Sequence, residues 1–117
     1  DITTAANAVA EQNETPRTFR LEQNYPNPFA SSAFTALRFT LPNAANVRLE
    51  IFNVIGERVA LLHAERFTAG AHAIDWDGRD QFGTAVSSGV YFYRLRAEEV
   101  GVGGKSWAAV RKLVVIR

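Results

Sequence analysis

The amino-acid sequence predicts an all-β fold, and three observations support this. Turn-forming residues recur after Phe19 at intervals of about 8–12 residues, the spacing typical of sandwiches and barrels. Apolar and polar residues alternate from Val47 to Ile51, as in a strand with one buried face. No stretch of about a dozen residues keeps apolar positions at helical spacing without Gly or Pro. The chain's 117 residues suffice for one core. Together these observations predict a seven-stranded antiparallel β-sandwich.

The strands follow from short runs of Val, Ile, Leu, Phe, Tyr and Thr that lie between turn signals. The predicted strands cover residues 19–23, 33–41, 45–54, 57–67, 71–77, 89–98 and 105–116. Pro26 and Pro28 end the first strand, and Pro42-Asn43 separates the second from the third. Gly56 supplies the positive φ of a tight hairpin turn after the third strand.

Glycine-containing turns separate the later strands. Ala69-Gly70 precedes the fifth strand, and residues 77–88 form the longest ordered connection. The run Val90–Arg96 begins apolar on both faces and then alternates, which is typical of a central strand leaving the core. Residues 101–104 form a hairpin tip, and Leu113–Ile116 is a closing apolar run too short for a helix.

Two regions of different composition divide the chain. Residues 1–18 are rich in Ala, Thr, Asn and Glu without aromatic residues, so we expect a flexible linker from an upstream cargo domain. Residues 19–117 form the β-sandwich domain. The sequence has no Met, even at position 1, and we therefore expect a fragment of a longer protein.

Composition excludes several classes of partner and cofactor. A net charge of +1 with interspersed charges argues against nucleic-acid binding, and no apolar run is long enough for membrane insertion. The absence of Cys rules out disulfides, zinc–thiolate sites and thiol nucleophiles. We expect no cofactor.

Two fragments of catalytic motifs are present, and neither predicts an enzyme. Gly104-Lys105-Ser106 matches the end of a phosphate-binding loop, but Glu99 replaces its first Gly and a strand follows. Residues 85–89 approach a nucleophile elbow, which requires a following helix and a downstream His. His63 and His72 lie upstream, and we expect both at the rim of the fold.

Two groups of side chains are candidate binding sites. Asp75, Asp77 and Asp80 form a weak Ca²⁺ candidate, set against an Asp-Gly turn in which Asp80 binds its own loop backbone. The aromatic residues that are candidates for a sugar-stacking platform are Trp76, Tyr91, Tyr93 and Trp107. Such residues more often fill a core, and an exposed Trp would favour an accessory structural or carbohydrate-binding module of a secreted enzyme.

An ordered series of motifs in this sequence resembles that of a known family. Leu21–Phe29 reads LEQNYPNPF and resembles the opening of type A C-terminal sorting domains of the type IX (Por) secretion system. The family's later motifs are similar to Phe39–Pro42, Val47–Glu57, Ala69–His72, Trp76–Asp80, Ser88–Leu95 and Lys112–Arg117. The motif residues are Asn24, Tyr25, Pro26, Asn27, Pro28, Phe29, Gly56, Gly70, Trp76, Asp77, Gly78, Gly89, Tyr91 and Tyr93. The middle motifs are also similar to the immunoglobulin-like domain of flagellar hook-capping proteins, which is a third interpretation.

The resemblance implies an immunoglobulin-like sandwich that acts as a non-catalytic signal. It implies a folded parent protein that passes from the periplasm through an outer-membrane translocon to the cell surface or the medium. The resemblance also implies a surface peptidase that removes the domain and links the parent to surface lipopolysaccharide. Residues 1–20 are the expected substrate for that cleavage.

Most motif residues have a sufficient explanation in folding. The prolines keep Asn24–Pro28 extended, and we expect Tyr25 and Phe29 to act as apolar anchors. We hypothesise that the translocon recognises the last strand, which we interpret as an edge strand with unpaired backbone groups and flanking charges. Its residues are Arg111, Lys112, Leu113, Val114, Val115, Ile116 and Arg117.

Overall fold

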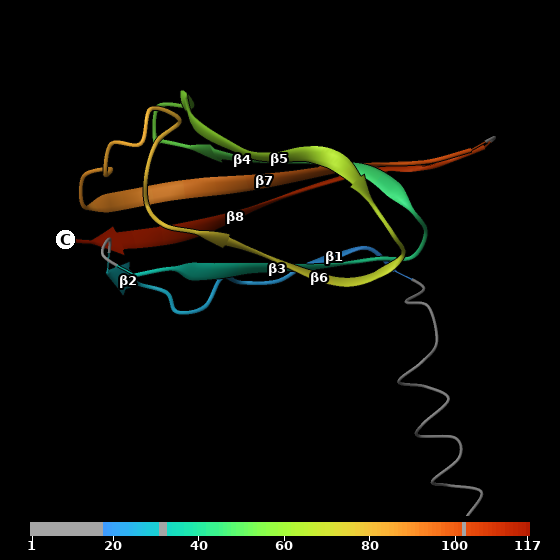
Figure 1. The fold of residues 1–117 in the computed structure, drawn as a ribbon, viewed down its shortest axis with the longest axis horizontal. Coiled ribbons are helices and arrows are strands. Elements are labelled where there is room, and N and C mark those ends of the chain that lie inside the picture. Colours follow the sequence, from blue (N-terminus) through green and yellow to red (C-terminus); the bar gives the residue numbers. More distant parts are fainter. Residues whose placement is uncertain (1–17, 31–32, 102) are drawn as a thin grey trace, which may run out of the picture.

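The structure, a computed structural model, describes residues 18–30, 33–101 and 103–117, so the predicted linker lies almost wholly outside the described residues. Figure 1 shows two sheets that pack face to face, and the all-β prediction is confirmed. No helix in the described ranges has the length and apolar character to cross a membrane. The strands are β1 (Arg20–Leu21), β2 (Phe29–Ala30), β3 (Thr35–Leu41), β4 (Ala45–Phe52), β5 (Arg58–Phe67), β6 (Gly70–Trp76), β7 (Gly89–Glu99) and β8 (Ser106–Ile116).

The sandwich has a three-stranded sheet in the order β1-β3-β6 and a five-stranded sheet in the order β2-β8-β7-β4-β5. The described residues therefore form eight strands, one more than predicted, because the two-residue strand β2 follows Pro28 without a recognisable apolar run. The prediction of a wholly antiparallel fold is wrong as well. β2 pairs with β8 in parallel, with Phe29 opposite Val115, because the chain crosses between sheets after β1.

The core lies between the two sheets. Alternation along β4 buries Val47, Leu49 and Ile51, as predicted. Other large side chains that are fully buried are Phe29, Leu37, Phe39, Leu41, Trp76, Tyr93, Leu95, Leu113 and Val115. Burial of each such apolar side chain stabilises the fold by roughly 1.5–3 kcal/mol.

The tight turn between β4 and β5 has the geometry that the sequence predicts. Gly56 has a φ of 86°, a conformation that other residues rarely adopt. The Asn53 side-chain oxygen Oδ1 accepts hydrogen bonds from the backbone N–H groups of Ile55 (3.1 Å) and Glu57 (2.9 Å). This capping by Asn53 ends β4 at Phe52, two residues before the predicted boundary.

Candidate recognition strand and N-terminal motif

The N-terminal motif connects the two sheets along one side of the sandwich. Tyr25 exchanges two backbone hydrogen bonds with Ala36 at the start of β3, at 3.1 and 2.8 Å. Four residues later, Phe29 pairs with Val115 of β8 in the other sheet. The motif therefore lies beside the terminal strand, which is the predicted recognition element.

A buried group of polar side chains fixes the path of the motif. The Asn24 Nδ2 group donates to the Thr35 hydroxyl at 2.9 Å and to the Pro26 carbonyl at 3.2 Å. The same Thr35 hydroxyl donates to the Pro26 carbonyl at 2.8 Å. Both side chains are buried, and these bonds offset the cost of removing them from water. This network supports a scaffold role for Asn24.

Side chains of the motif close the outer edge of β8 near its C-terminal end, at Lys112 and Val114. Gln23 Nε2 donates to the Lys112 carbonyl at 2.7 Å, and the Val114 N–H donates to Asn27 Oδ1 at 2.9 Å. Parallel pairing with β2 covers the edge at the next two residues. The prediction that this terminal segment offers unpaired backbone groups is therefore wrong. Gln23 belongs to the motif identified in the sequence, but its partner Lys112 lies 89 positions away, so the sequence did not predict this contact.

The structure divides the predicted recognition residues by accessibility. Leu113 and Val115 are buried in the core, so an external partner cannot contact them in the folded domain. Val114 is half-buried, whereas the exposed members are Arg111, Lys112, Ile116 and Arg117. Arg111 also donates from Nε to the Leu21 carbonyl at 2.7 Å, which ties β8 to β1.

Only one of the two predicted apolar anchors is buried. Phe29 packs against Trp76, with ring centroids 5.6 Å apart. Tyr25 is 71% exposed, so the prediction is wrong for this residue. In an extended backbone successive side chains point to opposite sides, and Asn24 takes the inward position.

The proposed sugar-stacking platform does not form. Trp76 is only 1% exposed and donates from Nε1 to the Arg79 carbonyl at 2.9 Å. Tyr91 and Tyr93 are buried too, and Tyr93 donates to the Glu22 carbonyl of the motif at 2.6 Å. Burial raises the pKa of Tyr93 to about 12. Trp107 is half-buried and stacks on Phe19 at 5.8 Å.

The aspartates after β6 organise their own loop. Asp80 Oδ1 accepts from the backbone N–H groups of Phe82 and Thr84, each at 2.9 Å, which confirms the turn interpretation. Asp77 Oδ1 accepts from the Arg79 N–H at 3.1 Å, and Asp75 is exposed on β6. Within the described ranges, no three potential metal-ligating side chains gather.

The remaining candidates have structural positions. Ser106 begins β8 and residue 89 begins β7, so neither motif fragment precedes a helix. His63 pairs with Glu65 at 2.6 Å, and His72 contacts the Thr68 carbonyl at 2.7 Å. Both rings are half-buried at the rim, as predicted.

The sheet order and the motif-bound terminal strand define an immunoglobulin-like β-sandwich module. Residues 23–101 match the FlgD Ig-like domain family, and the chain belongs to that family. Comparison with curated proteins gives no significant match.

Three solved structures are similar to this chain at low sequence identity. Dimeric latent PorU from Porphyromonas gingivalis is similar with a TM-score of 0.66 and 21% identity, over 89% of this chain and 10% of PorU. FlgD from P. aeruginosa is similar with a TM-score of 0.57 and 18% identity, over 86% of this chain and 74% of FlgD. PorZ, a surface component of the type IX secretion system of Porphyromonas gingivalis, has a TM-score of 0.46 and 23% identity, over 81% and 11%. The chain thus spans about a tenth of the length of PorU.

Proposed function

We propose that residues 19–117 form a non-catalytic C-terminal sorting domain of the type IX secretion system. The domain directs a parent protein from the periplasm through the outer-membrane translocon. A surface peptidase then cleaves the chain before the domain, and the parent reaches the cell surface or the medium. The ordered motifs from Leu21 to Arg117 support this proposal, and the shared fold with the PorU segment is consistent with it.

The observation that carries the proposal is the contact between the N-terminal motif and the terminal strand. These two segments are far apart in sequence, yet Gln23 and Asn27 bind the backbone of Lys112 and Val114 directly. The motif thereby holds the last strand in one place while leaving some of its side chains accessible. A signal that is read on a folded domain requires such a fixed terminal surface.

The accessible side chains carry the recognition hypothesis. Lys112, Ile116 and Arg117 are exposed, whereas the backbone edge next to them is closed. We therefore expect the translocon to contact the two cations and the apolar tip of Ile116, rather than add a strand at this edge. The substitutions Lys112→Gln and Arg117→Gln remove charge without removing a core side chain.

An export assay tests the proposal. The full chain is fused behind a periplasm-targeted fluorescent protein, in hosts with and without a working type IX translocon. We expect fluorescence outside the cell only when the translocon works. Periplasmic retention of an intact, folded fusion in both hosts would overturn the sorting function.

A matched pair of variants separates the signal from the fold. The Lys112→Gln/Arg117→Gln variant should stay folded and lose export. The control Arg20→Gln/Arg38→Gln removes two exposed cations from the three-stranded sheet and should be exported normally. Equal export of both variants would contradict the recognition hypothesis without contradicting the sorting function.

A further inference from the structure

The outer face of the five-stranded sheet collects positive charge. Residues directly opposite one another on neighbouring strands point to the same side of the sheet. On the outer face, Asn46, Arg48, Glu50 and Phe52 of β4 lie opposite residues of β5 on one side and of β7 on the other, and these β7 residues lie opposite residues of β8. Its basic side chains are Arg48, Arg58, Arg66, Arg94, Arg96 and Lys112, and its carboxylates are Glu50 and Glu98. The whole chain has a net charge of only +1, so this face is strongly basic relative to the rest.

Glu50 is already fully engaged by its neighbours. The residue is 3% exposed, and its carboxylate lies 2.9 Å from Arg94, 3.3 Å from Arg58 and 3.4 Å from Arg48. Burial opposes the charged form, but the hydrogen bonds from Arg94, Arg58 and Arg48 and the charge of Arg94 together outweigh it and hold the pKa of Glu50 below its usual value. One carboxylate balances one of these three arginines, so positive charge remains.

That excess charge is concentrated where Arg48 lies directly opposite Arg96 on neighbouring strands. Like charges in this position destabilise a sheet, and within the described residues no carboxylate lies within 4.0 Å of the Arg96 guanidinium. The small residues Ala64 and Ala108 flank the pair on the adjacent strands.

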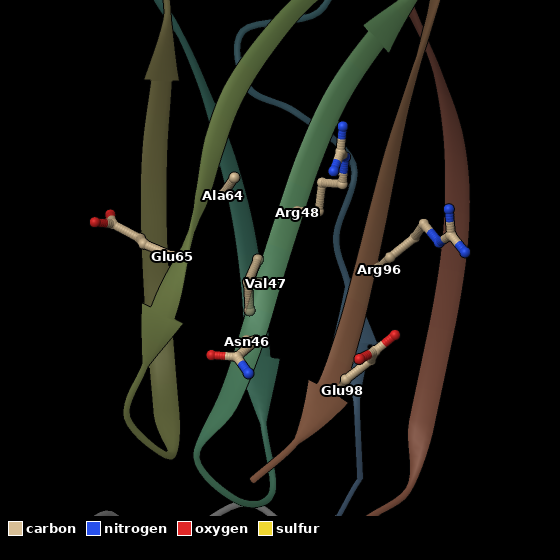
Figure 2. A pocket seen from close by; sticks show the side chains of 7 residues that line it. All are labelled: Asn46, Val47, Arg48, Ala64, Glu65, Arg96 and Glu98. Carbon is tan, nitrogen blue, oxygen red and sulfur yellow. The ribbon is translucent and has the colours of Figure 1, made fainter.

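A hollow of about 440 Å³ lies along this row. Figure 2 shows Arg48 on β4 and Arg96 on β7, with the Arg96 guanidinium extending toward β8 and with Ala64 on β5 at the other side of Arg48. Asn46 and Glu98 form its far end, and Glu65 points away from both arginines. The hollow thus combines two guanidinium groups with space above small side chains.

We propose that this hollow binds a phosphate monoester between the guanidinium groups of Arg48 and Arg96. Directly opposite residues in an antiparallel pair have Cα atoms about 4.5–5.5 Å apart, which lets two long side chains reach one tetrahedral group. Guanidinium forks donate paired hydrogen bonds to phosphate oxygens. A phosphate monoester carries a charge of about −1.5 to −2 at pH 7, which suits Arg96 together with Arg48, whose Glu50 partner is shared with Arg58 and Arg94, whereas a carboxylate carries only one charge.

An NMR titration of the full chain with inorganic phosphate tests this site. We expect saturable shifts of the Arg48 and Arg96 signals that sodium chloride at equal ionic strength does not reproduce. Arg96→Gln should weaken phosphate binding by about tenfold. The control Arg38→Gln, on the outer face of the three-stranded sheet, should leave the affinity unchanged.

The outcomes decide the proposal separately from the sorting function. Shifts that never saturate, or equal affinity in Arg96→Gln and the parent chain, would overturn the site. Arg96 is exposed outside the Glu50 cluster, so Arg96→Gln should stay folded, which the dispersion of its spectrum checks. The second variant Arg48→Lys keeps the charge but loses the fork, and we expect weaker binding.

Two further probes identify the source of the phosphate. Glucose 6-phosphate represents soluble sugar phosphates, and vesicles containing phosphatidic acid represent lipid headgroups, with phosphatidylcholine vesicles as the control. Binding of either probe that Arg96→Gln weakens supports the site and names its source. Binding of neither, or binding that Arg96→Gln leaves unchanged, would contradict the proposal.

Discussion

The two flanks of the five-stranded sheet are protected from pairing with other chains in different ways. The β8 flank consists of β8 and residues 23–30, which cover it with the neutral side chains of Gln23 and Asn27 and with the short strand β2. The β5 flank ends the sheet on the other side, with two register shifts against β4 and several charged residues. Exposed edges invite pairing with other chains, and both devices discourage it.

The difference shows what the N-terminal motif contributes. On the β8 flank, protection depends on one segment that is remote in sequence and on hydrogen bonds between neutral groups. On the β5 flank, it depends on local irregularity and on ion pairs, since Arg58 of β5 reaches Glu50 of β4. The β8 flank should therefore respond to mutations in the motif, and the β5 flank to pH.

The largest effect should come from Phe29→Ala, which breaks the β8 flank. The variant removes a buried ring that packs on Trp76 and leaves a cavity. We expect the free energy of unfolding to fall by about 3–5 kcal/mol in urea denaturation. Tyr25→Ala is the matched control, because this exposed aromatic of the same motif should change stability by about 0.5 kcal/mol or less. Similar losses in both variants would contradict the burial difference.

A smaller effect is expected from Glu50→Gln, which weakens the β5 flank. The substitution removes the charge that three arginines share, although these arginines are partly exposed to solvent. We expect a loss of about 1–3 kcal/mol in the same assay. Glu65→Gln removes an exposed carboxylate paired with His63, and its loss should be smaller. A neutral result for Glu50→Gln would mean that the cluster does not stabilise the flank.

Acid should remove the advantage that Glu50 gives to the parent chain. The pKa of Glu50 lies below its usual value of 4.5 in the folded protein, because the arginine hydrogen bonds outweigh burial. Its contribution is therefore present above pH 4.5 and is lost as the pH falls through the folded-state pKa. Urea denaturation above and well below this pH should show the parent chain converging on Glu50→Gln. A constant difference at all pH values would argue against this account.

The sequence predicts the parts of this fold that depend on nearby residues. Alternation placed Val47, Leu49 and Ile51 in the core, and Gly56 marked the turn, because both effects act within a few positions. Asp80 was similarly predicted to bind its own loop.

Contacts between distant segments escaped prediction. β2 has two residues and exists only because β8 lies beside it. Glu50 sits on the polar face of an alternating strand, and its burial depends on arginines from three strands. The C-terminal part of the β8 edge is closed by hydrogen bonds that span 87 and 89 positions. The sequence alone therefore predicted an open edge strand.

The smallest and most local effect should come from Asn27→Ala, which opens the β8 flank at one bond. The Val114 N–H loses its acceptor, and we expect a cost of about 1 kcal/mol and faster hydrogen exchange at Val114. Asn27→Asp keeps an oxygen acceptor at the same position and should restore slow exchange. Exchange at Val47, whose strand is paired on both sides, should stay unchanged in both variants. Slow exchange at Val114 in Asn27→Ala would mean that β2 alone closes this edge, and the role of the motif would then reduce to the burial of Phe29.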